Sequence, residues 1–385
     1  MSWETVRLGD IAEFSNGINF DKSAYSKGVK LIGVSNFGNR FSPDYDSLEE
    51  IKKEVVRSND YLRNEDIVFV RSNGNKELVG RCMLINNPES PVTYSGFCIR
   101  ARLNDTKRHN PVFFTYLFKS SDFRKAMTGS AVGANIQNLS QGRLSACEVR
   151  IPNYDLQVRI ADILSAYDDL IENKQKQIKL LEEAAQRLYK EWFVDLRFPG
   201  YENTPIIDGV PQGWRKELVG NVIEKSYSSK QVMTADYLAE GKIPIVDQSR
   251  DFIAGYTDDE ETLVFLGKPV IVFGDHTRVL KYIQFPFAKG ADGTQLIVSK
   301  CENMPQSLLY LSLLNIDLSN YHYARHFKYL KAEEIIIPNI EITIKLDYLV
   351  SPIFKKVQIL RDQIIGAQQA RDRLLPKLMS GELEV

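Results

Sequence analysis

Apolar residues recur every three or four positions in two long segments of the chain, residues 156–193 and 346–378. The steps alternate between four and three, which is the heptad spacing of a helix that packs against another helix. The first seam consists of Ile160, Leu164, Tyr167, Ile171, Lys174, Ile178, Leu181, Ala185, Leu188 and Trp192. The second seam consists of Leu346, Val350, Ile353, Val357, Leu360, Ile364, Ala367, Arg371, Leu374 and Leu378. We predict that the two helices pair as an antiparallel coiled coil. Packing of each helix on its own globule, or dimerisation through a seam, are the alternatives.

Each seam has one polar break, at Lys174 in the first and at Arg371 in the second. The second segment also contains Pro352, which lacks a backbone N–H and crowds the preceding helical turn. We therefore predict a kink or a new helix start at Ser351 and Pro352.

A repeat relates the two halves of the chain. The tripeptide Ile-Pro-Asn precedes both helices, at residues 151–153 and 337–339, and a shift of 186 residues keeps the two seams in phase. Residues 3–11 (WETVRLGDI) have a weaker echo in residues 213–222 (GWRKELVGNV). The sequence therefore predicts four parts in the order globule, helix, globule, helix, with the boundaries 1–150, 151–198, 199–336 and 337–385.

Both globules show the same order of short elements, which predicts an α+β fold for each. In the first, a strand at residues 66–71 runs into a polar loop, a second strand follows at 94–100, and a helix covers 111–118. In the second, the matching elements lie at residues 269–273, 291–298 and 307–314. Two similar globules held apart by helices suit an extended target with two half-sites, and DNA is the obvious one.

Composition places the chain among folded, soluble proteins. Of its 385 residues 43% are hydrophobic and 26% are charged. No apolar run approaches the roughly 20 residues that span a bilayer, and no signal-peptide core is visible, so we expect a cytoplasmic protein without membrane contact. None of the cysteines lies in a Cys-x-x-Cys pair, so we expect buried free thiols. They are Cys82, Cys98, Cys147 and Cys301.

The charge distribution is more informative than the net charge of −1. Residues 67–150 carry 12 Lys and Arg against 5 Asp and Glu, and residues 268–331 carry 8 against 4. The later part of each globule is therefore basic, which favours contact with phosphates. Ordinary solvated surface charge is the alternative interpretation.

No motif indicates catalysis by this chain. It has no phosphate-binding loop, no Gly-x-Gly cofactor turn, no Asn-Pro-Pro-Phe/Tyr methyltransferase motif and no His-Glu-x-x-His. Pro43 and Asp44 followed by Glu50 resemble a nuclease motif only superficially. His322 and His326 lack a third ligand, so they make a weak metal signal. We expect a non-catalytic protein that binds neither a cofactor nor a metal.

Three segments resemble the specificity subunit of type I restriction–modification systems. They are residues 3–11, residues 151–164 with their Ile-Pro turn and RIADIL run, and residues 371–383 (RDRLLPKLMSGEL). The resemblance covers nearly the whole chain. It implies two target-recognition domains separated by two long antiparallel helices, with each domain reading one half of a bipartite, asymmetric DNA site.

The resemblance also implies partners. Two modification subunits would bring S-adenosylmethionine and methylate adenine, and restriction subunits would bring ATP and Mg for translocation and cleavage. This chain would supply only the recognition of double-stranded DNA. A DNA-binding adaptor of another defence or regulatory complex, and a coiled-coil scaffold that binds no DNA, are the alternatives.

Two groups of polar residues are our candidates for DNA contact. The first follows the matched strands and consists of Arg71, Asn73, Asn75, Lys76 and Arg81 in the first globule, and of His276, Arg278 and Lys281 in the second. The second precedes each Ile-Pro turn and consists of Asn135, Gln137, Asn138, Gln141 and Arg143 in the first copy, and of Arg325, His326, Lys328 and Lys331 in the second. Arg and Asn can read guanine and adenine edges, whereas Lys favours phosphate contacts.

Overall fold

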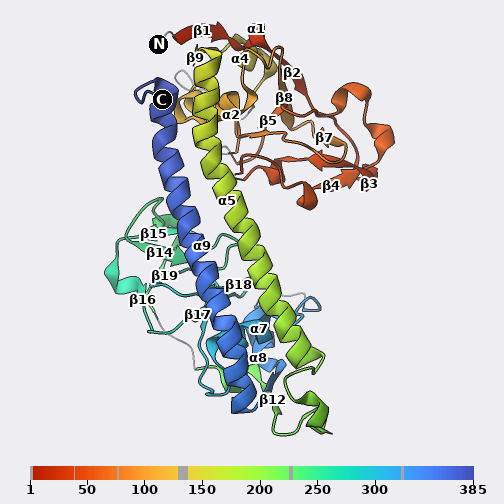
Figure 1. Ribbon diagram of the computed structural model, residues 1–385, viewed down its shortest axis with the longest axis vertical. Helices are drawn as coiled ribbons and strands as arrows, with labels where there is room; N and C mark the ends of the chain where they lie inside the picture. Colours follow the sequence, from red (N-terminus) through yellow and green to blue (C-terminus); the bar gives the residue numbers. More distant parts are fainter. Residues whose placement is uncertain (1–2, 39, 76–77, 129–137, 225–228, 322–324) are drawn as a thin grey trace. The chain divides into compact units, whose positions relative to one another are not determined.

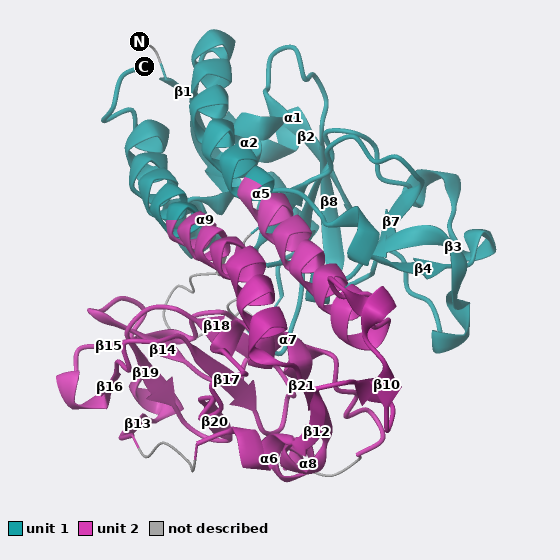
Figure 2. Ribbon diagram, turned by 60° about the horizontal axis from the view of Figure 1, so that its bottom comes forward, with its two compact units in different colours: residues 1–173, 363–385 teal, residues 174–362 magenta. Residues whose placement is uncertain are grey.

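The computed structural model describes residues 3–38, 40–75, 78–128, 138–224, 229–321 and 325–385 (Figure 1). The chain divides into two compact units, shown in two colours in Figure 2. Unit 1 comprises residues 1–173 and 363–385, and unit 2 comprises residues 174–362. Each long helix, α5 (Tyr154–Tyr189) and α9 (Ile340–Ser380), contributes one half to each unit. The boundary between the two units therefore falls inside each long helix, whereas the sequence pattern predicted each helix as a segment of its own.

The strand before each long helix forms the same antiparallel ladder in both units. In unit 1, β1 (Trp3–Arg7) pairs with β9 (Glu148–Pro152), and in unit 2, β12 (Arg215–Leu218) pairs with β21 (Glu334–Ile337). The asparagine after each ladder then caps the helix, because Asn153 Oδ1 accepts the Leu156 N–H at 3.0 Å and Asn339 Oδ1 accepts the Ile342 N–H at 3.0 Å. The repeated Ile-Pro-Asn motif thus has the same structure twice.

Unit 1 contains two small sheets beside its ladder. Its remaining strands are β2 (Ala12–Asn16), β3 (Tyr25–Ile32), β4 (Glu49–Ile51), β5 (Ile67–Val70), β6 (Cys82–Leu84), β7 (Val92–Tyr94) and β8 (Cys98–Leu103). One sheet has the order β2-β8-β5-β6 and is antiparallel, and in the other β3 lies between β4 and β7. Its short helices are α1 (Leu8–Ile11), α2 (Pro111–Lys119), α3 (Ser121–Thr128) and α4 (Gln141–Ala146).

Unit 2 repeats this frame. Its strands, besides β12 and β21, are β10 (Ile206–Ile207), β11 (Val210–Pro211), β13 (Gln231–Val232), β14 (Ile243–Val246), β15 (Gly255–Thr257), β16 (Leu263–Val264), β17 (Val270–Gly274), β18 (Leu280–Ile283), β19 (Phe287–Gly290) and β20 (Thr294–Ile297). β17 lies between β18 and β20, as β5 lies between β6 and β8. Its short helices are α6 (Val219–Val222), α7 (Gln306–Leu314) and α8 (His326–Ala332), and a π-helical turn (Lys190–Val194) follows α5.

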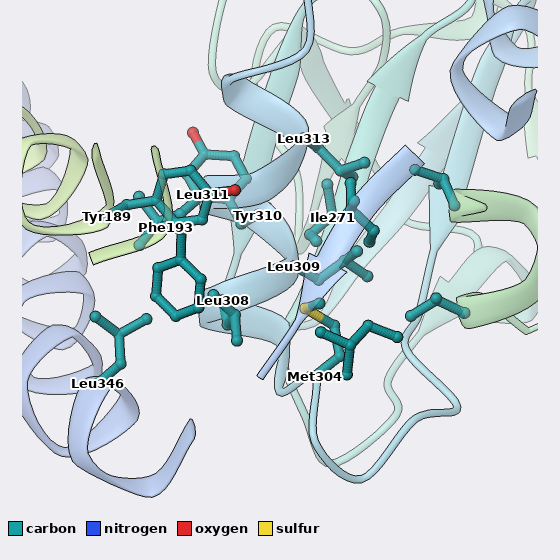
Figure 3. Packing of buried hydrophobic residues seen from close by; sticks show 14 of the residues in the cluster. Tyr189, Phe193, Ile271, Met304, Leu308, Leu309, Tyr310, Leu311, Leu313 and Leu346 are labelled. Carbon is teal, nitrogen blue, oxygen red and sulfur yellow. The ribbon is translucent and has the colours of Figure 1, made fainter. Parts of the chain in front are cut away.

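The hydrophobic core of each unit includes its own halves of the long helices. In unit 1, Phe113 and Phe118 of α2 share a buried cluster with Leu164 of α5 and Leu378 of α9. In unit 2, Figure 3 shows α7 side chains such as Leu308 near Phe193 and Leu346, and all three belong to one buried cluster. The seams therefore serve as domain core as well as helix interface.

The two helices pair in antiparallel fashion, as predicted. In unit 1, Arg371 of α9 forms an ion pair with Asp168 of α5, and in unit 2, Arg361 donates to Glu182 at 2.7 Å. Higher residue numbers on α5 are therefore matched by lower numbers on α9. The seam residues that are fully buried are Ile160, Leu164, Ile171, Ala185, Trp192, Leu346, Val350, Val357, Leu360, Ala367 and Leu378. Those that are half-buried include Ile178, Leu181, Leu188, Ile353, Ile364 and Leu374.

Three local expectations need correction. α9 runs through Pro352, so of the two outcomes expected there, the new helix start is wrong. Pro352 lies on the exposed side of α9, where water can hydrate the carbonyl that it leaves unbonded. The strand expected at residues 94–100 is instead the end of β7, a turn, and the start of β8. All four cysteines are free, but only Cys82 and Cys98 are buried, whereas Cys147 and Cys301 are half-buried.

Candidate nucleic-acid interface

In unit 1, the loop that follows β5 contacts two other segments. One is the turn between β7 and β8, and the other is the segment before α4, which carries further candidate residues. The Arg71 N–H donates to Phe97 O at 2.7 Å, in the turn between β7 and β8. The Arg71 carbonyl accepts the Leu139 N–H at 2.8 Å, and Ser72 forms a bridge with Asn138. We call this surface, formed by residues 71–75, 96–97 and 138, loop surface 1.

In unit 2, the loop that follows β17 makes the same two contacts. The Asp275 N–H donates to Gly293 O at 2.7 Å, in the turn before β20. The Asp275 carbonyl accepts the His326 N–H at 2.9 Å, at the start of α8. We call this surface, formed by residues 248, 275–278, 293 and 325, loop surface 2. Arg71 and Asp275 therefore occupy the same position in the repeated frame.

In loop surface 1, some side chains form hydrogen bonds within the protein and others are exposed to solvent. The Arg71 Nη1 donates to Gly96 O at 3.3 Å, and the side chain is half-buried. Asn73 Oδ1 accepts the Asn75 N–H at 2.7 Å, which is a local turn that asparagine favours. Phe97 is 61% exposed beside them. The surface thus combines an arginine, the three amides of Asn73, Asn75 and Asn138, and an exposed ring.

Loop surface 2 is built from different residues. Gln248 Oε1 accepts the His276 N–H at 3.1 Å, and its carbonyl accepts the Thr277 hydroxyl at 2.6 Å. Gly293 has a φ of +71°, and a Cβ atom there would lie 2.7 Å from the His276 ring. Glycine is therefore required where this turn meets the loop.

Arg278 and the adjoining basic residues complete loop surface 2 and its surroundings. Arg278 is exposed with a left-handed φ of 61°, which a long side chain rarely adopts, and its Nη1 donates to Leu318 O at 3.0 Å. Arg325, Lys328 and Lys331 are exposed, the first before α8 and the other two on it. Lys331 Nζ lies 5.0 Å from the centre of the Phe327 ring. These cations can meet phosphates without rearrangement of the core.

Two sequence candidates do not belong to the surface. Lys281 lies within β18 rather than in the loop, is 4% exposed, and donates to the carbonyls of Asp247 and Asp251. His326 is 5% exposed, and its ring nitrogens face the carbonyls of Asp275 and Tyr321. We therefore correct both assignments to internal, structural roles.

Two further candidates lie elsewhere in unit 1. Arg81 lines a cavity near the end of α2 rather than loop surface 1. Arg143 of α4 donates to Ala126 O at 2.8 Å and so ties α4 to α3. Lys76, Asn135, Gln137 and His322 lie outside the described residues.

Sequence reasoning missed Gln248 and Asp275. Gln248 follows the apolar strand β14, so the rule that selected the loops after β5 and β17 would have found it if applied to this strand. Asp275 is buried, and its Oδ1 accepts the Phe327 N–H at 2.7 Å. It therefore fixes the start of α8 against the loop.

The described residues contain no group of three or more His, Cys, Asp or Glu side chains that could hold a metal ion. Within those same residues, no helix has the length and hydropathy to cross a membrane. The two loop surfaces present hydrogen-bond donors, acceptors and cations, which are the groups that recognise base edges and phosphates.

Comparison with known proteins agrees with this interpretation. Residues 1–183 match the family model of the type I restriction modification DNA specificity domain. The specificity subunit of the type I restriction enzyme MjaIX from Methanocaldococcus jannaschii is 30% identical over 300 residues, which cover 71% of this chain and 69% of that protein. The putative MjaX specificity subunit of the same organism is 23% identical, over 100% of this chain and 94% of its own.

A solved structure shares the fold over almost the full length. The S subunit of a type I restriction–modification system from M. genitalium aligns over 98% of this chain and 96% of its own, with a TM-score of 0.55 and 15% identity. This likeness shows that the duplicated α+β unit with paired long helices is a fold that the chain shares with that S subunit. The chain belongs to the family of type I restriction–modification specificity subunits, which recognise DNA sequence and assemble with other subunits of these systems.

Proposed function

We propose that this chain reads a bipartite, asymmetric DNA site, with loop surface 1 on one half-site and loop surface 2 on the other. The observation that carries this proposal is the shared frame with different side chains. The same backbone contacts position Arg71 in unit 1 and Asp275 in unit 2, and Asn73 and Asn75 have no counterparts among His276 and Arg278. Two different readers in one chain suit two different half-sites.

The division of labour within each surface follows from the chemistry of its side chains. Arg71, Asn73 and Gln248 have the forked donors and acceptors that read base edges in the major groove. Lys328 and Lys331 are flexible point charges, which suit phosphates and position the protein without specifying sequence.

We further propose that the chain is non-catalytic and directs adenine methylation and restriction by partner subunits. Two modification subunits would carry S-adenosylmethionine, and restriction subunits would carry ATP and Mg. An exposed apolar face on α9 supports such docking, because Ile344, Tyr348 and Ile359 each expose half or more of their surface. Residues 344 and 348 lie one helical turn apart on that face.

Two measurements test the proposal. A mobility shift with the full chain and its modification subunits, repeated over a salt series, should show an affinity that falls steeply with salt, because each phosphate contact releases counterions. Methylome sequencing should then show one bipartite adenine motif that disappears when the gene for this chain is deleted. A flat salt response would favour the coiled-coil scaffold. DNA binding without a lost methylation motif would favour an adaptor in another complex.

A further inference from the structure

Unit 1 contains a cavity of about 340 Å³ that neither loop surface includes. It lies between the recognition domain and the unit 1 halves of α5 and α9, and it is far larger than the roughly 10–15 Å³ that one water molecule needs. Its charged lining comes from Arg81, Lys119, Arg124, Arg371, Asp168 and Asp372. Among the residues that the structure describes, four cations and two carboxylates line this space, so the described lining is net positive.

The two carboxylates are already engaged with Arg371. Asp168 forms an ion pair with Arg371 and accepts the Tyr116 hydroxyl at 2.5 Å, and Asp372 accepts from Arg371 at 2.8 Å. The Arg371 and Asp168 side chains are 14% and 12% exposed. The polar break in the second seam is thus a charged network at the wall of the cavity.

Lys119 lies at the end of α2, and its Nζ donates to Arg40 O at 2.9 Å. Burial lowers the pKa of Lys119, and the nearby Arg371 and Arg81 act in the same direction, while Asp168 opposes them. Burial also raises the pKa of the Cys82 thiol to about 11, so the thiol adds no negative charge at neutral pH. An ammonium in this position is stabilised by an additional anion.

We propose that this cavity binds an oxyanion of the phosphate class, held by Lys119 together with Arg81, Arg124 and Arg371. Guanidinium forks match phosphate oxygens in a bidentate geometry, which favours phosphate over a spherical anion. Ser120 and Ser121, at the junction of α2 and α3, also line the cavity, and the Ser120 hydroxyl donates to Leu117 O at 2.6 Å. Because three of the cations come from the recognition domain and Arg371 comes from α9, the bound anion ties the domain to the helices.

The phosphate group can belong to a free small molecule or to the DNA backbone, and the second source rests on the proposed function. The first arm of the test uses inorganic phosphate. Calorimetry on the full chain should give saturable binding, and phosphate should raise the melting temperature. Arg124→Gln and Lys119→Met should weaken the binding about tenfold or more, the loss of one charge-assisted hydrogen bond. Lys125→Gln is the matched control, because it removes an exposed charge from the same helix α3.

The second arm uses DNA at constant ionic strength. If a backbone phosphate occupies the cavity, inorganic phosphate competes with DNA, and Arg124→Gln lowers the salt slope by about 0.9. If a free anion occupies it, phosphate binds and DNA affinity does not change. If the chain binds no DNA at all, the proposed function is wrong, but the phosphate titration still tests the anion site. The proposal is overturned if Arg124→Gln binds phosphate as the parent chain does, or if phosphate does not bind and the salt slope is unaltered. Arg124→Gln decides the matter if Lys119→Met fails to fold.

Discussion

At the scale of single residues, the two units present different side chains at positions whose backbone contacts match. Arg71 and Asp275 make equivalent backbone contacts, yet one side chain reaches a turn carbonyl and the other is buried against α8. The repeated frame therefore fixes where a loop lies, while the residue type decides what it presents. Residue-level predictions belong to these loops.

Replacement of Arg71 and Asn73 by alanine should weaken specific binding and leave non-specific binding nearly unchanged. A good bidentate contact contributes about 1–3 kcal/mol of discrimination. Competition binding with specific and scrambled duplexes measures this difference. The matched control replaces Arg57 and Asn59, which are exposed, have the same residue types at the same spacing, and lie outside loop surface 1. Equal selectivity of the two double variants would exclude loop surface 1 from base reading.

Replacement of Lys328 and Lys331 by glutamine should weaken binding to every DNA sequence alike. Each lost phosphate contact should lower the salt slope by about 0.9. The measurement is a salt titration on two unrelated duplexes, with Lys216 and Lys242, exposed lysines of the same unit, replaced as the control. A loss confined to one duplex would instead indicate base reading by α8.

At the scale of elements, the paired helices contribute to the hydrophobic core of each unit, and each helix continues from one unit into the other. Their seams bury residues inside each unit, and the Asp168–Arg371 and Glu182–Arg361 pairs fix the antiparallel direction. Ile178 lies between the two acidic partners and Ile364 between the two arginines. Insertions after these two residues therefore fall between the two ion-pairing positions in the sequence of each helix.

Insertion of one heptad after Ile178 and one after Ile364 should preserve the pairing and abolish recognition of the original site. Seven residues add about 10 Å of helix, or about three base pairs at roughly 3.4 Å each. The added base pairs also rotate the groove by about 100°, so a site with a longer spacer does not follow automatically. Methylome sequencing of cells that carry the variant with its methyltransferase is the measurement. Normal modification of the unaltered site would show that the helices do not set the spacing.

At the scale of the whole molecule, the duplication predicts independent readers. Each unit has its own core, its own ladder before a capped helix and its own loop surface. An exchange of one domain must respect this core, because Ile160 and Leu164 of α5 and Leu378 of α9 belong to it. The domain boundary at residue 150 also lies inside β9, which pairs with β1.

Exchange of residues 1–150 for the matching domain of a relative should change one half of the recognised site and keep the other. The reason is that loop surface 2 lies entirely in residues 248–325 and is carried over unchanged. Methylome sequencing of the hybrid gives both half-sites in one experiment, and its melting temperature checks the repacked core. A hybrid in which both halves change would show that the domains do not read independently.

The sequence by itself determined the features that depend on local periodicity. Heptad spacing located both helices, and the repeated Ile-Pro-Asn motif located where both begin, because a seam and a helix start involve residues within a few positions of each other. Apolar runs likewise located β5, β17 and the helices α2 and α7. The resemblance of short segments at the start, middle and end was enough to indicate the family.

The tertiary structure decided which polar residues come together. Sheet order placed Lys281 inside a strand and His326 under a loop, and it brought Gln248 to the surface beside His276. Long-range packing gathered Arg81, Lys119, Arg124 and Arg371 around one cavity, although they are separated by up to 290 residues of chain. No local pattern encodes such contacts, because they depend on how strands pair and helices dock across the whole unit.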